Sequence, residues 1–125
     1  YDFGRKQSIY ITTSWINLTK PGMSHHIHSH PNSFISGVFY FETLENDLIN
    51  IHSSGPKFSH LSASISPSVI GDIHKEKVID RNLLLFPSWL NHSVDKNKEE
   101  KNRISLAFNT YVKGPFGKNI SFVEI

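Results

Sequence analysis

Apolar and polar residues alternate along most of the chain, and β-branched and aromatic side chains are prominent at the apolar positions. A period of two is typical of strands that bury one face. Pro, Gly, Asn and Ser separate these segments, and none has the period of a long helix. The pattern therefore predicts an all-β protein with one domain over residues 1–125 and a core at about 8–112. Strands are predicted at 8–18, 34–41, 47–52, 62–66, 83–86, 92–95 and 103–112, with a last edge strand at 121–125.

Two segments lack a clear strand pattern. Residues 53–77 are rich in Ser, Pro, Gly and His, which predicts a long loop region. Residues 95–102 read DKNKEEKN and are interpreted as a solvated turn between two strands. Neither segment carries a recognisable motif of its own.

The last long strand has two faces of different character, because successive side chains of a strand point to opposite sides. One face is apolar and is expected to pack in the core. The other is small and polar with one cation, as expected for a surface that lines a ligand cavity. The apolar face has Ile104, Leu106 and Phe108, and the polar face has Arg103, Ser105, Ala107 and Asn109.

Composition narrows the function classes. The chain has 125 residues, a formal net charge of +2 and no cysteine. The charge is too small to indicate a nucleic-acid surface, and no apolar run approaches the roughly 20 residues that span a bilayer. The N-terminal residues YDFGRKQSIY do not resemble a signal peptide. We therefore expect a cytoplasmic protein in which any metal is held by His, Asp or Glu.

Four of the eight histidines lie within residues 25–30. His28 and His30 are two apart, so on one strand they would share a face and could share a metal ion. His92, about 60 residues later, would supply a third ligand from a neighbouring strand. Three protein ligands leave coordination positions open, which is typical of catalytic sites. A site built on His26 and His28 is the alternative register, and His25 and His26 are otherwise expected to be loop residues.

Three ordered sequence blocks carry a family resemblance. They are H-x-H-P-N-S-x-x-S-G-V-x-Y at 28–40, L-L-F-P-S-W-L-x-H-S-V at 84–94 and R-I-S-x-A-F-N at 103–109. Together they resemble a group of 2-oxoglutarate- and Fe(II)-dependent oxygenases, many of them from phages and marine bacteria. The resemblance spans about residues 15–112 and implies a double-stranded β-helix, or jelly roll.

The resemblance also implies roles for individual residues. His28, His30 and His92 would hold Fe(II), and the far carboxylate of 2-oxoglutarate would pair with Arg103. The hydroxyl of Tyr40 would assist Arg103. With O₂, the enzyme would convert 2-oxoglutarate to succinate and hydroxylate a substrate that the sequence does not identify. Asn109 and Trp15 are weaker candidates for the lining of the cosubstrate pocket.

One departure from the family pattern keeps other functions open. Most such oxygenases have a carboxylate where this chain has His30, so three imidazoles would leave the site more positive. A cupin-like metal-binding protein, or a three-histidine dioxygenase that does not use 2-oxoglutarate, is the alternative. A structural jelly-roll module with incidental histidines is a third hypothesis. The exposed edge at 121–125 could also pair two copies into a homodimer.

Overall fold

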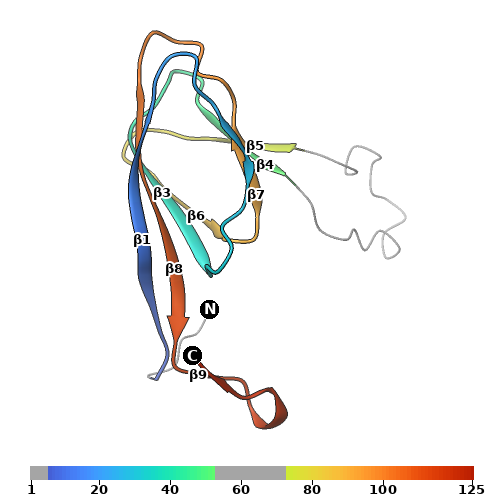
Figure 1. The fold of residues 1–125 in the computed structure, drawn as a ribbon. Coiled ribbons are helices and arrows are strands. Elements are labelled where there is room, and N and C mark those ends of the chain that lie inside the picture. Colours follow the sequence, from blue (N-terminus) through green and yellow to red (C-terminus); the bar gives the residue numbers. More distant parts are fainter. Residues whose placement is uncertain (1–5, 53–72) are drawn as a thin grey trace, which may run out of the picture.

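The computed structural model describes residues 6–52 and 73–125, which form ten strands and one short 3-10 helix. The strands lie in two four-stranded sheets and one two-stranded sheet. Figure 1 shows the two larger sheets facing each other. The strands are β1 (Ser8–Thr19), β2 (His25–His28), β3 (Ile35–Glu42), β4 (Leu48–His52), β5 (Ile73–Lys77), β6 (Leu83–Pro87), β7 (Asn91–Val94), β8 (Arg103–Lys113), β9 (Pro115–Phe116) and β10 (Val123–Glu124); the 3-10 helix is η3 (Asn119–Ser121).

The first sheet has the order β1–β8–β3–β6 and is antiparallel throughout. Strands β1 and β8 pair over almost their whole length, from Ser8 opposite Lys113 to Thr19 opposite Arg103. The second sheet has the order β2–β7–β4–β5. Apart from β4 and β5, the strands that are neighbours in these two sheets are not consecutive in the sequence, which is typical of a jelly roll. The predicted all-β jelly-roll fold is therefore confirmed.

A small apolar core lies between the sheets. Tyr40 of β3, Ile49 of β4 and Val78, just after β5, are at most 4% exposed and pack together. Half-buried Val38, Ile51, Leu84 and Val94 surround them. Because β3 and β4 belong to different sheets, this cluster joins the two layers.

The prediction that the apolar face of the last long strand packs in the core is wrong. Ile104, Leu106 and Phe108 are half-buried on the outer face, whereas Arg103 and Ser105 are buried on the inner face. The alternation along β8 was predicted correctly, but the apolar side is not the core. The reason is that the inner face of β8 borders a polar cavity, which leaves the apolar side chains on the side away from β4 and β7.

Other expectations fare differently. The strands at 8–18, 34–41, 47–52, 83–86, 92–95 and 103–112 are confirmed with small shifts in their ends. The loop expected at 53–77 is wrong at its end, because 73–77 form β5, whose five residues pair with Leu48–His52. The strand expected at 62–66 lies outside the described residues.

At the C-terminal end, β10 pairs with β9, and Gly114 and Ile125 exchange two backbone hydrogen bonds.

Within the described residues, no helix is long and apolar enough to span a lipid bilayer.

Candidate metal centre

Three histidines converge at one end of the space between the sheets. His28 ends β2, His92 lies in β7 directly opposite it, and His30 follows β2 by two residues. One ring nitrogen from each of the three lies within 4.8 Å of the others. The Nε2 atoms of His30 and His92 are 3.3 Å apart. The arrangement has the nitrogen donors and the spacing that one metal ion requires.

Backbone carbonyls fix the tautomers of two of these rings. The Nδ1 atom of His28 is 2.8 Å from the carbonyl oxygen of His26, and Nδ1 of His92 is 2.9 Å from that of Leu90. A carbonyl can only accept, so in both rings Nδ1 carries the hydrogen. The lone pair of each ring is therefore on Nε2, where a metal can bind it. Such hydrogen bonds are a regular feature of metal-binding histidines.

His30 reaches the site by a different route from the one expected. It was predicted to share a strand with His28, but β2 ends at His28. A turn follows at Pro31 and Asn32, in which Asn32 has a positive φ of 56°. The backbone N–H of His30 donates to the carbonyl of Ser88 at 2.8 Å, which anchors the segment beside β6 and β7. A loop held by this bond thus brings His30 to the other two histidines.

Burial favours the neutral form of two of the imidazoles. Burial, together with the nearby His92 and His28, lowers the pKa of His30 from 6.5 to about 4. Burial also lowers the pKa of His92, although the hydrogen bond to Leu90 opposes that change. The neutral imidazole is the form that binds metal, so the lowered pKa values of His30 and His92 favour binding of a cation near neutral pH.

A narrow cavity of about 60 Å³ connects the histidines with Arg103. Its walls include apolar side chains from both sheets and the small residues of β8. Arg103 is only 4% exposed, so its charge is taken out of bulk water. The lining residues are Trp15, Asn17, His25, His28, His30, Val38, Tyr40, Ile49, His92, Val94, Arg103, Ser105 and Ala107.

The guanidinium of Arg103 forms an ion pair with Asp47. Its Nη1 donates to Oδ1 of Asp47 at 2.9 Å, and the side chains are 4% and 3% exposed. Its Nε is buried and has no hydrogen-bond partner among the described residues. Arg103 is therefore a buried residue of the cavity wall and not a surface arginine. A buried donor without a partner is rare and indicates a missing acceptor.

Tyr40 lies beside this pair and remains a phenol. Burial raises its pKa to about 12; Arg103 opposes the rise and Asp47 adds to it. The hydroxyl is therefore protonated at neutral pH and can donate a hydrogen bond. Trp15 is at the cavity wall, with its ring centroid 5.8 Å from that of His30.

Asn109 is placed differently from the other predicted residues. Its Oδ1 accepts a hydrogen bond from the hydroxyl of Ser36 at 2.8 Å, and it is not among the residues that line the cavity. A role for Asn109 in binding cosubstrate stays a prediction. Its bond to Ser36 ties β8 to β3 at the end of the sheet.

Sequence reasoning missed two residues near the site. Nothing in the sequence around Asp47 points to a contact with Arg103. His25 was expected to be a loop residue, but it begins β2 and lines the cavity, with Nε2 2.9 Å from the hydroxyl of Thr19. Burial lowers its pKa, and Arg103 lowers it further. The pairing of Thr19 with Arg103 explains why His25 lies near that charge.

Comparison with known proteins assigns the family. The family model described as "Putative 2OG-Fe(II) oxygenase" matches residues 13–109. The chain belongs to this 2OG-Fe(II) oxygenase family. The family implies Fe(II) and 2-oxoglutarate as cofactors, and the three histidine nitrogens fit an iron ion, because imidazole is a common ligand of iron.

Solved structures agree on the fold. A 2OG-Fe(II) oxygenase family oxidoreductase from Burkholderia pseudomallei has 13% identity and a TM-score of 0.64, over 86% of this chain and 46% of that one. A prolyl-4-hydroxylase from Pseudomonas putida has 18% identity and a TM-score of 0.52, over 77% of this chain and 50% of that one. The chain thus spans about half the length of these neighbours. Among curated proteins, none matches the sequence.

Proposed function

We propose that this chain is the catalytic domain of a 2-oxoglutarate- and Fe(II)-dependent oxygenase that hydroxylates a substrate still to be identified. The overall reaction balances as 2-oxoglutarate, O₂ and a substrate C–H bond giving succinate, CO₂ and a C–OH group. The observation that carries the proposal is the buried, incompletely paired Arg103 in the same cavity as three histidine nitrogens.

The three histidines would hold the metal. His28 and His92 present Nε2 lone pairs because carbonyls occupy their Nδ1–H groups, and His30 completes the set. A bound ferrous ion supplies the O₂ activation that couples decarboxylation of 2-oxoglutarate to substrate oxidation. Because His30 replaces the usual carboxylate, all three ligands are neutral.

Arg103 and Tyr40 would hold the far carboxylate of 2-oxoglutarate. The guanidinium fork matches a carboxylate with two parallel N–H···O bonds, and the Tyr40 hydroxyl is a neutral donor beside it. The cavity joins Arg103 to the histidines, so a linear diacid bound along it would reach both. Val38, Ile49 and Ala107 line the same space and would keep water away from it.

A metal-binding protein that does not use 2-oxoglutarate is the second candidate. The replacement of a carboxylate ligand by His30 favours it, as does the carboxylate that Arg103 already has in Asp47. It predicts metal uptake without binding or turnover of 2-oxoglutarate.

The decisive experiment measures succinate formed from 2-oxoglutarate with Fe(II) and O₂, alongside anaerobic binding of 2-oxoglutarate to the iron-loaded protein. The visible charge-transfer band of the iron complex reports that binding. We expect turnover that needs iron, and an Arg103→Lys variant that binds iron normally but 2-oxoglutarate at least about tenfold more weakly, about 1.4 kcal/mol. The exposed Arg81 provides the matched control, Arg81→Lys. Iron binding without any binding of 2-oxoglutarate would establish the second candidate instead.

A further inference from the structure

The ion pair between Arg103 and Asp47 raises a question for the proposed function, on which this inference rests. A cation meant for the cosubstrate already contacts a carboxylate of the protein at 2.9 Å. An ion pair buried this deeply is weak evidence for stability, because desolvating both charges costs about as much as their attraction returns. A role in the cavity would explain why the pair is there.

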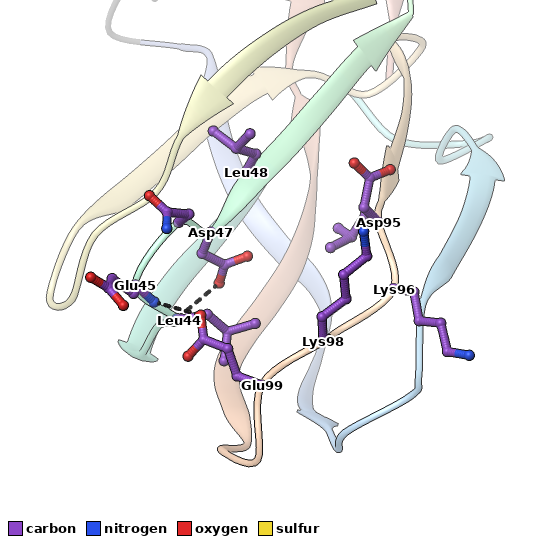
Figure 2. A pocket seen from close by; sticks show the side chains of 10 residues that line it. Leu44, Glu45, Asp47, Leu48, Asp95, Lys96, Lys98 and Glu99 are labelled. Carbon is purple, nitrogen blue, oxygen red and sulfur yellow. Dashed lines mark hydrogen bonds between the residues drawn. The ribbon is translucent and has the colours of Figure 1, made fainter.

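Asp47 is fixed by its own surroundings rather than by Arg103 alone. It lies between β3 and β4, and its carbonyl accepts the N–H of Val78 at 3.1 Å. The N–H of Leu44 approaches its Oδ2 at 3.5 Å. Figure 2 shows Asp47 among the residues that line a second cavity, where the N–H of Glu45 also donates to Oε1 of Glu99 at 2.9 Å. The carboxylate therefore approaches Arg103 from the side of this second cavity.

The contact occupies one corner of the guanidinium. Asp47 accepts a hydrogen bond from Nη1, and Nε remains buried without a hydrogen-bond partner among the described residues. The N–H of Nε and one N–H of Nη2 point the same way along one edge of the planar group, which is an edge that binds carboxylates in bidentate fashion. A guanidinium held at Nη1 keeps that edge in one orientation.

We propose that Asp47 is a positioning residue, which holds Arg103 by Nη1 so that its Nε–Nη2 edge receives the far carboxylate of 2-oxoglutarate. Asp47 itself does not touch the cosubstrate. Without it, the long Arg103 side chain gains rotamer freedom, and binding 2-oxoglutarate has to order it again. The opposite hypothesis is that Asp47 only offsets the charge of Arg103, in which case its removal would make the cavity more attractive to a dianion.

The test compares Asp47→Ala with Asp95→Ala. Both changes remove a carboxylate that lines the same second cavity, but the side chain of Asp95 is 65% exposed and it pairs with Lys75 rather than Arg103. We expect Asp47→Ala, which leaves no acceptor for Nη1, to raise the KM and the dissociation constant for 2-oxoglutarate about fivefold to tenfold while kcat and iron affinity stay near wild type. Asp95→Ala should change neither constant.

A double-mutant cycle separates positioning from a general loss of structure. If Asp47 acts through Arg103, Asp47→Ala has no further effect on 2-oxoglutarate binding in an Arg103→Lys background. Unchanged or tighter binding by Asp47→Ala would overturn the proposal, as would equal effects in both backgrounds. If wild type binds no 2-oxoglutarate, the proposed function fails as well, which the wild-type measurement alone reveals.

Discussion

The two faces of the sheet β1–β8–β3–β6 differ in a way that an ordinary β-sandwich does not. On the inner face, Arg103 and Ser105 are at most 4% exposed although both are polar. On the outer face, Leu83 and Leu85 are 52% and 55% exposed although both are apolar. The registers of β1, β3 and β6 continue the same division, so it extends across the whole sheet.

The difference shows that which side chains of this sheet are buried depends on their position at the cavity and not on their polarity. The inner face must leave room for a cavity and place a cation in it, so small and polar residues are buried there. The outer face carries side chains that a core would use, and Phe108 lies so close over Gly37 that a β-carbon there would clash with its ring. Predictions that compare the inner and outer faces therefore separate function from packing.

The largest effect is expected at the three histidines that we propose as metal ligands. His92→Ala removes a nitrogen that forms part of the three-histidine group, so we expect metal affinity to fall by more than about 100-fold, since even supporting residues cost 10–100-fold. Succinate formation should be lost with it. Equilibrium dialysis with Fe(II) or Co(II) measures the affinity. His74→Ala is the matched control, because His74 is exposed and contacts Glu76, and unchanged metal affinity in His92→Ala would refute the site.

The next largest effect contrasts the core with the outer face. Ile49 is 2% exposed and joins the two sheets, so Ile49→Ala should lower the free energy of unfolding by about 2–5 kcal/mol. Leu85→Ala deletes the same number of carbon atoms from a side chain that is 55% exposed and should cost about 1 kcal/mol or less. Urea denaturation of both variants measures the difference. Equal costs would mean that the outer face is packed as tightly as the core.

A smaller effect is expected from pH in the metal-free protein. The pKa of His30 falls from 6.5 to about 4 on folding, so between these values the unfolded chain takes up a proton that the folded chain does not. The contribution of His30 to the free energy of unfolding is therefore complete above pH 6.5, and it is lost as the pH falls from 6.5 toward about 4. Thermal unfolding with a chelator present should give a lower Tm at about pH 5 than at about pH 7.5. This fall in Tm should be smaller in His30→Gln than in wild type. An identical fall in both proteins would contradict the assignment to His30.

Much of this architecture was predictable from local patterns. Alternation located β1, β3 and β8, and the spacing of His28, His30 and His92 indicated the three-histidine group that the structure brings together. Local patterns could not show which side of β8 is inside, because alternation defines two faces without saying what covers either.

Other features depend on contacts between distant segments. Asp47 and Arg103 are 56 positions apart, and no short motif marks either as the other's partner. Asn97 lies in a charged stretch that was interpreted as a solvated turn, yet it is 3% exposed, and its amide donates to the carbonyls of Thr19 and Lys101. Such pairings follow from the folded topology, so a single sequence does not reveal them.

Substitutions on the outer face are expected to have the smallest effect on the free energy of unfolding. They should nevertheless change the binding of a fluorescent dye clearly. Ile16 and Leu85 are 60% and 55% exposed, so changing both to Lys should alter the free energy of unfolding by only about 0.5 kcal/mol per site. Wild-type protein should bind the dye ANS through its exposed apolar side chains, and the double variant should bind less. The matched pair Lys75→Gln and Lys113→Gln removes exposed charges and should leave dye binding unchanged. Wild-type protein that binds no dye would show that the outer face is covered in solution, and the contrast between the two faces of the sheet would then disappear.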